Sequence, residues 1–219
     1  MRSLRTLTGL LLVIGATVAA GQAPSSGTFP KDIYPETGNR FPALKREALN
    51  EAGKKLYDAR GAVDAYGPGP MRLYSPSVAA PMTDVNEYLR RKSGLEPRLV
   101  ELAILVTARE MDCAYVWTVH EPAAQKAGLP QAIIDTVKFR RPLTTTVGDK
   151  ETVIIQLGRD SIGKHKVSSE TFARAVKLFG NRGVVDLVAL IGDYAATTIL
   201  ANVADQHVRP KDKSLLPIP

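Results

Sequence analysis

Three residue types that often carry chemistry are scarce in this chain. Among 219 residues there is one cysteine, Cys113, one tryptophan, Trp117, and three histidines, His120, His165 and His207. A lone cysteine has no partner for a disulfide within the chain, and the histidines are too far apart in sequence for a short metal-ligand motif. We therefore expect no disulfide framework and no metal.

The usual patterns for nucleotide and nucleic-acid binding are also missing. Residues 67–70 (Gly-Pro-Gly-Pro) have turn chemistry rather than that of a phosphate loop, and the chain has no Gly-x-Ser-x-Gly elbow of a serine hydrolase. Aromatic residues make up 6% of the chain, and the lysines and arginines are dispersed despite a net charge of +7. We expect no cofactor and no nucleic-acid partner.

The first residues are typical of an exported protein. Arg2 and Arg5 precede an apolar run, and small residues follow it up to Ala20. This order predicts a signal peptide over residues 1–20, with cleavage after Ala20 or Ala23. An uncleaved anchor is the alternative, but the run is shorter than the roughly 20 residues that a spanning helix needs. The expected mature protein is periplasmic or secreted, has no stable membrane span, and has lost two arginines, which lowers its net charge from +7 to +5.

The rest of the chain divides into three parts by composition. Residues 21–41 are rich in Gly, Pro, Ser and Thr, which predicts an extended arm or linker. Residues 42–209 show helical spacing of apolar side chains and should form one domain. Residues 210–219 should form a flexible tail.

Apolar periodicity and helix-breaking residues predict an all-α bundle of about seven to eight main helices. Gly94 and Pro97 mark one boundary between helices, and Gly128 and Pro130 mark another. The expected helices lie at about 42–60, 78–92, 97–111, 113–127, 130–139, 149–162, 169–179 and 182–205, with a short turn of helix at 71–74. Residues 144–147 are a weak candidate for a strand.

A central antiparallel helix pair should carry the site. Residues 98–111 are apolar on most sides, which indicates a buried helix, and the next helix places Cys113, Val116, Trp117 and His120 on one face. If the turn between the two helices falls near residues 111–113, Glu101 and His120 come to a similar height on neighbouring helices.

A carboxylate beside an imidazole orients one ring tautomer and stabilises the protonated ring. Glu101 and His120 are therefore the first candidates for a proton donor and acceptor. The alternative is a buried pair whose two side chains only satisfy each other's hydrogen bonds. Cys113, at the start of its helix, is a candidate thiolate, or else a small buried hydrophobe. Trp117 and Tyr115 are possible pocket walls or core residues, and Arg109 is the nearest cation in sequence that could hold a carboxylated substrate.

The segment 97–140 resembles the carboxymuconolactone decarboxylase and alkylhydroperoxidase D (AhpD-like) superfamily of small all-helical proteins. The resemblance rests on residues 98–105 (RLVELAIL), 115–120 (YVWTVH) and 127–129 (AGL), with weaker agreement in the flanks. It implies the AhpD-like helical fold and a homo-oligomer, often a trimer or a hexamer.

The peroxidase branch of the superfamily has a glutamate, a Cys-x-x-Cys motif and a histidine, which fall on Glu101, Cys113, Val116 and His120. Val116 replaces the second cysteine, so the disulfide that the resemblance implies cannot close within this chain. In the decarboxylase branch the Val116 position often carries glutamate, followed by a tryptophan and a histidine as at Trp117 and His120. The chain therefore departs from both branches at one position.

Three functions follow from these residues. The first is cofactor-free acid/base chemistry on a small lactone or carboxylated substrate, with His120 as the acid or base and Glu101 as its partner. The second is a non-catalytic or binding relative, in which the apolar last helix serves an interface. The third is a one-cysteine peroxidase, in which Cys113 forms a sulfenic acid that an external thiol resolves.

Overall fold

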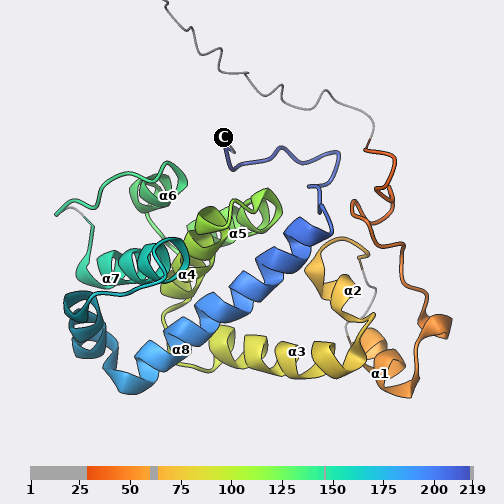
Figure 1. The fold of residues 1–219 in the computed structure, drawn as a ribbon, viewed down its shortest axis with the longest axis horizontal. Helices are drawn as coiled ribbons and strands as arrows, with labels where there is room; N and C mark the ends of the chain where they lie inside the picture. The colour runs from red at the N-terminus through yellow and green to blue at the C-terminus, as the bar shows by residue number, and fades with distance from the viewer. Residues whose placement is uncertain (1–28, 60–63, 146, 218–219) are drawn as a thin grey trace, which may run out of the picture.

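The computed structural model describes residues 29–59, 64–145 and 147–217, and within these ranges the molecule is all-helical (Figure 1). The predicted signal peptide, residues 1–20, lies outside the described residues. The elements in chain order are η1 (Arg46–Ala48), α1 (Glu51–Ala59), α2 (Pro68–Arg72), α3 (Pro76–Arg91), α4 (Pro97–Glu110), α5 (Ala114–Lys126), α6 (Gln131–Lys138), α7 (Asp149–Gly158), η2 (Arg159–Gly163) and α8 (Ser169–Val203). The predicted all-α class is confirmed.

Helix α4 is the centre of the molecule. Every residue from Leu99 to Arg109 is buried, and α4 packs against α5, α7 and α8. Pro97 lies in its first turn, where a missing backbone N–H costs no hydrogen bond. The apolar surface on all sides of this helix is what allows three neighbours to cover it.

Helices α4 and α5 pack side by side around a tight turn, as the sequence predicts. Asp112 has a left-handed backbone conformation, with φ of 47°, and the Cys113 N–H donates to the Ala108 carbonyl at 2.8 Å. Cys113 then precedes the first turn of α5. The turn brings the first half of α4 beside the second half of α5, which is the arrangement that the site requires.

Helix α8 is long and kinked. The expected break near residue 180 is present, because Gly180 has φ of 67° within the span Ser169–Val203. By length and composition alone, α8 could cross a membrane, but core helices of folded domains have the same length and composition. Half of the most apolar stretch of α8 is buried inside the molecule. α8 packs against α3, α4 and α7 (Figure 1).

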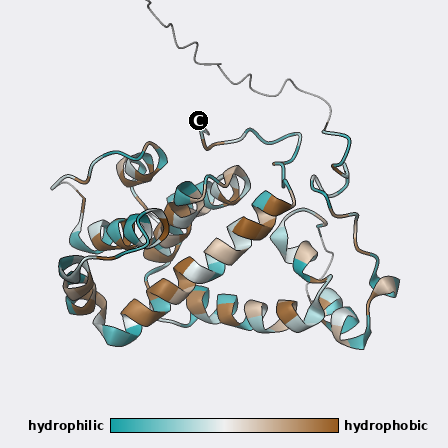
Figure 2. Cartoon of the chain, viewed as in Figure 1, coloured by the Kyte–Doolittle hydropathy of each residue, from teal (hydrophilic) through white to brown (hydrophobic). Residues whose placement is uncertain are grey.

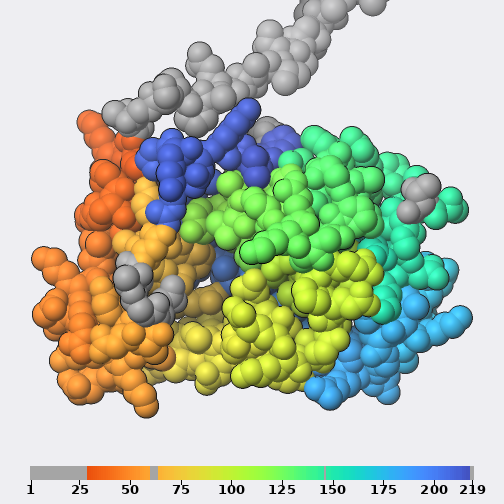
Figure 3. Space-filling model, turned by 180° about the vertical axis from the view of Figure 1, so that it is seen from behind, coloured from red at the N-terminus to blue at the C-terminus, as the bar shows by residue number. Residues whose placement is uncertain are grey.

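Two segments that were expected to be irregular are fixed to the body. In the arm, Arg40 N–H donates to the Ala204 carbonyl at 2.9 Å, and Gly38 accepts from the His207 N–H at 2.8 Å. In the predicted flexible tail, Leu216 is buried and the Leu215 N–H donates to Thr118 Oγ1 at 3.1 Å. Seen from behind, the C-terminal segment lies between the arm and α5 (Figure 3). The expectation of a loose tail is wrong for these residues.

Two local expectations also need correction. The predicted first helix begins at Glu51 rather than at Pro42, because the Asn50 side chain accepts the Gly53 N–H at 2.8 Å and caps the helix there. The segment 144–147 forms no strand at its described positions, and the one β-bridge of the described chain joins Tyr34 to Asn39.

A candidate acid–base site on the central helix pair

Glu101 and His120 meet as the spacing of the two helices predicts. Glu101 Oε2 lies 2.7 Å from His120 Nδ1. Glu101 is 7% exposed and His120 is 9% exposed, so the contact is largely shielded from water. A hydrogen bond of this length between a carboxylate and an imidazole is charge-assisted whenever the ring is protonated.

The second oxygen of Glu101 is held by a residue of another helix. Arg90, near the end of α3, donates from Nη2 to Glu101 Oε1 at 3.0 Å. Nη2 is the one nitrogen of Arg90 that has a described acceptor, and its Nε is buried without a partner. One carboxylate thus links a guanidinium on one side to an imidazole on the other.

The far side of the His120 ring is covered by α8. Tyr194 packs edge-on against the imidazole, with ring centroids 5.2 Å apart and an interplanar angle of 89°. Burial raises the pKa of Tyr194 to about 12. Tyr194 is therefore a neutral phenol at physiological pH and restricts the ring of His120 without adding charge.

The charge state of Glu101 follows from its partners. Burial alone raises the pKa of this carboxyl group, but the hydrogen bond and charge of His120, together with Arg90, outweigh burial and leave the pKa below its ordinary value. The group is ionised at neutral pH. An ionised Glu101 accepts the proton of His120 Nδ1, which leaves Nε2 as the reactive nitrogen.

A hollow of about 530 Å³ lies beside this network. Arg90, Arg91, Glu101 and Val100 line it together with the loop 94–97 between α3 and α4. Glu101 and Arg90 thus face the hollow, whereas His120 is not among its lining residues and is joined to it through Glu101. Its volume falls in the usual range for small-molecule sites.

Cys113 is not brought into this network. Its side chain is buried, and no described contact joins it to Glu101 or His120. Burial raises the pKa of the Cys113 thiol, although the backbone N–H groups of Val116 and Tyr115 act in the opposite direction. The position at the helix start is therefore too dry to favour a thiolate.

Arg109 lies at the opposite end of α4 from Glu101. Eight residues of helix separate them by about 12 Å along the axis. Arg109 is buried, and its Nη1 donates to Asp112 Oδ1 at 2.6 Å. Burial, and secondly the nearby Arg140, lower the pKa of Arg109. The structure thus places Arg90, rather than Arg109, beside the proposed acid–base pair.

The two aromatic residues that were expected as pocket walls are engaged elsewhere. Trp117 is fully buried and donates from Nε1 to Glu121 Oε2 at 2.5 Å, while the Lys138 ammonium lies 5.7 Å from the centre of its ring. Tyr115 is half-buried next to Gly67, and burial raises its pKa to about 12. Neither residue lines the hollow beside Glu101.

No group of three or more His, Cys, Asp or Glu side chains is placed to hold a metal ion in the described part of the chain. Arg90 and Tyr194 belong to the site but were not predicted from the sequence. Arg90 lies before a loop whose path decides where it points, and Tyr194 lies in a long apolar helix with many equivalent positions. The one available signal was the charge of Arg90 near the end of an otherwise amphipathic helix.

The fold and the buried acid–base pair define a class of all-helical proteins with a site on two central helices. Residues 76–141, which include α3 to α6, match the family model described as the carboxymuconolactone decarboxylase family. This match confirms, over residues 76–141, the resemblance that the sequence indicated.

Among solved structures, the chain is similar to an alkylhydroperoxidase AhpD core, an uncharacterized peroxidase-related protein from Ralstonia eutropha JMP134. The TM-score is 0.63 with 13% sequence identity, over 78% of this chain and 92% of the other. At this identity the likeness shows the fold alone. The comparison with curated proteins finds no match.

Proposed function

We propose that this protein is a cofactor-free enzyme that performs acid/base chemistry on a small lactone or carboxylated substrate. The observation that carries the proposal is the 2.7 Å contact between Glu101 Oε2 and His120 Nδ1. Glu101 itself lines a hollow that also presents Arg90. The match of residues 76–141 to the carboxymuconolactone decarboxylase family supports the same chemistry.

In this mechanism His120 carries the proton and Glu101 positions the ring. When the carbon–carbon bond to a substrate carboxylate breaks, carbon dioxide leaves and the electron pair stays on the substrate carbon. The protonated His120 then gives its Nε2 proton to that carbon, and the ionised Glu101 stabilises the imidazolium until then. A positioned proton donor of this kind accelerates a reaction by roughly 10²–10⁴-fold.

Arg90 is the cation that we assign to the substrate. It lines the hollow with about a third of its side chain exposed, and only one of its nitrogens is bound to Glu101. A guanidinium is suited to a carboxylate or a lactone carbonyl oxygen because it offers several donors in one plane. The same group would stabilise negative charge that develops on a substrate oxygen.

A non-catalytic relative remains the second candidate, and one observation favours it. Both oxygens of Glu101 already have partners within the protein, and the His120 ring is not among the residues that line the hollow. Such a pair can exist for packing alone. The peroxidase alternative has less support, because Cys113 is buried and its pKa is raised.

We further propose that the protein is exported to the periplasm or secreted and that it forms a homo-oligomer. Export is supported by the order of charged, apolar and small residues at the N-terminus. Oligomer formation is supported by an exposed apolar face of α8, made of Val185, Val188, Ile199 and Val203. These positions are spaced so that they share one side of the helix.

The proposed function is tested by turnover of a panel of small lactones and β-keto or unsaturated carboxylates, followed by carbon dioxide release. His120→Ala should lower kcat by about 10²–10⁴-fold. Arg90→Gln should raise KM with a smaller change in kcat. Arg174→Gln should change little, because Arg174 lies on α8 outside the hollow and is paired with Asp149.

Cys113→Ala separates the candidates within the same panel. It should leave decarboxylation unchanged, and wild-type protein should reduce hydrogen peroxide no faster than this variant does. Equal turnover by wild type and His120→Ala on every substrate would reject the acid–base enzyme. A peroxidase activity that disappears with Cys113 would favour the third candidate instead.

A further inference from the structure

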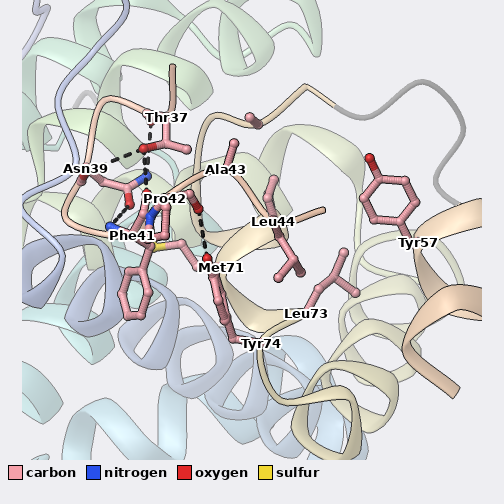
Figure 4. Close-up of a pocket in the computed structure, with 12 residues that line it drawn as sticks. Thr37, Asn39, Phe41, Pro42, Ala43, Leu44, Tyr57, Met71, Leu73 and Tyr74 are labelled. Carbon is pink, nitrogen blue, oxygen red and sulfur yellow. Dashed lines mark hydrogen bonds between the residues drawn. The ribbon is translucent and has the colours of Figure 1, made fainter. Parts of the chain in front are cut away.

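A second hollow, of about 220 Å³, lies at the other end of α3 from the acid–base site (Figure 4). Its walls come from the arm, from α1 and from the segment around α2, and include Thr37, Phe41, Leu44, Tyr57, Met71 and Tyr74. Tyr74 precedes α3, whereas Arg90 lies near its end, and the helix between them is roughly 24 Å long at 1.5 Å per residue. This hollow lies outside residues 76–141, which match the family model, so it is a feature of this chain's own arm and first helices.

The hollow is lined by aromatic and apolar side chains. Figure 4 shows the rings of Phe41 and Tyr74 on one side, with Met71 beside them, and Tyr57 on the other side, with Leu44 between. The Phe41 and Tyr74 rings have centroids 5.4 Å apart and an interplanar angle of 39°. No charged side chain is among its described lining residues. Ring faces and a methionine thioether favour a flat aromatic guest.

The walls of this hollow are fixed by hydrogen bonds. The Tyr74 hydroxyl donates to the Pro42 carbonyl at 2.9 Å, and Thr37 Oγ1 donates to the Phe41 carbonyl at 2.8 Å. Asn39 Oδ1 accepts the Phe41 N–H at 2.8 Å. The same arm segment is joined to the end of α8 through Arg40. A hollow with walls held in this way does not need to be assembled by its ligand, which lowers the entropic cost of binding.

One polar group of the hollow is left unused. The hydroxyl groups of Thr37 and Tyr74 bind backbone carbonyls, and the Asn39 amide binds both backbone groups and the Gln206 side chain. The Tyr57 hydroxyl has no hydrogen-bond partner among the described residues, although its ring lines the hollow. It can donate to, or accept from, a single polar group on a guest.

We propose that this hollow is a binding site for a neutral aromatic compound of one ring that carries one hydrogen-bonding group, such as a phenol. The volume is somewhat larger than the roughly 150 Å³ of an engineered protein cavity that holds benzene, which leaves room for small substituents. A carboxylate is disfavoured, because none of the described lining residues is a cation and a charge buried there would lose its hydration. This site is independent of the acid–base chemistry at Glu101 and His120.

The test uses methyl NMR of the full-length protein labelled at its methionines. The chain has four methionines, of which Met71 lines the hollow and Met82 and Met111 do not, so that the latter two serve as internal controls. We titrate 4-methylphenol and, as the charged counterpart of similar shape, 4-methylbenzoate. The expected result is a saturable shift of the Met71 methyl signal with 4-methylphenol, with a Kd in the millimolar range or below, and no such shift with 4-methylbenzoate.

Two variants and one matched control complete the test. Tyr57→Phe should weaken 4-methylphenol binding by about 2- to 10-fold through loss of one hydrogen bond. Ala43→Trp should fill the hollow and abolish the titration. Tyr34→Phe removes an exposed hydroxyl outside the hollow and should leave the affinity unchanged.

The proposal is overturned if Met71 shows no saturable shift, if 4-methylbenzoate binds equally well, or if Tyr57→Phe and Ala43→Trp both bind as wild type does. It is also overturned if the Met71 methyl contacts another segment of the chain in the absence of any additive, because the protein would then occupy the hollow itself. None of these results depends on turnover, so a failure of the proposed enzyme activity would not affect the test of this binding site.

Discussion

Glu101 is the residue on which the proposed chemistry depends, because its two oxygens bind Arg90 and His120. Its burial is tolerated only because both partners are present, since an unpaired buried charge costs several kcal/mol. The partners lower the pKa of Glu101 below its ordinary value. Its contribution to stability is therefore fully present above the unfolded pKa, near 4.3, and is lost as the pH falls through the folded pKa.

The lowered pKa of Glu101 can be tested by substitution of this residue. Glu101→Gln should lower the free energy of unfolding by about 1–3 kcal/mol at pH 7, because the part-buried Arg90 contact loses its counter-ion and His120 loses a carboxylate partner. The difference from wild type should shrink as the pH falls below the unfolded pKa, near 4.3, towards the lowered folded pKa of Glu101. Denaturant unfolding at a series of pH values measures both. A difference that stays constant across this range would mean that Glu101 is not ionised in the folded protein.

Individual residues also show where reasoning from the sequence succeeds. The Glu101–His120 contact was predictable because two helices of known pitch and a short turn fix the relative height of their side chains. Arg109 was chosen for its nearness in sequence, but a helix carries it about 12 Å away from Glu101. Arg90 is near in space because the loop 94–97 reverses the chain, and the path of a loop is not encoded in apolar periodicity.

Among the elements, α4 and α7 show how closely helices can pack in this fold. Gly158, at the end of α7, faces α4, and an added Cβ atom there would lie 2.3 Å from Val106 Cγ1. Val106 is itself buried and cannot move aside freely. The glycine is therefore required by the approach of the two helices rather than by its backbone angles.

Gly158→Ala should accordingly lower the free energy of unfolding by about 1–3 kcal/mol, as overpacking in a core does. Gly163→Ala is the control, since a Cβ atom at the exposed Gly163 meets only Glu110 Oε2, at an ordinary contact distance of 3.4 Å. This control should change the free energy of unfolding by less than about 0.5 kcal/mol. Urea unfolding of both variants measures the effect, and equal behaviour of the two would show that α4 and α7 separate easily.

Element boundaries were predictable where the signal is a local residue and not where it is a distant contact. Pro97, Gly128 and Gly180 mark helix ends or kinks because proline and glycine change the backbone conformation at their own positions. The segment before Glu51 has the apolar spacing of an α-helix but forms only the short 3₁₀ helix η1, and the carbonyl of Pro42 is bound by Tyr74 instead of by a helical N–H. That partner lies 32 residues later in the chain.

At the scale of the whole molecule, the exposed face of α8 is the feature without an explanation inside one chain. Val185 and Val203 are 66% and 64% exposed, and Val188 and Ile199 are about half exposed. Figure 2 shows how much of α8 is hydrophobic. Exposed apolar side chains grouped on one face are typical of surfaces that are covered in an assembly.

If the protein is a homo-oligomer that uses this face, Val185→Asp combined with Val188→Asp should shift it towards the monomer. Sedimentation velocity over a range of concentrations measures the change. Val119→Asp is the control, because Val119 is equally exposed but lies on α5. A wild-type protein that sediments as a monomer at all concentrations, or an unchanged assembly in the double variant, would contradict this interface.

The position of Trp117 has a practical consequence for all of these measurements. The chain's one indole is sealed in the interior, bonded to Glu121 and close to the Lys138 ammonium. The emission maximum of Trp117 should therefore lie at short wavelength in the folded protein and shift to longer wavelength when unfolding exposes the indole to water. Fluorescence of the unlabelled protein then reports the separation of α5 from α6 at one position, Trp117, which lies three residues before His120.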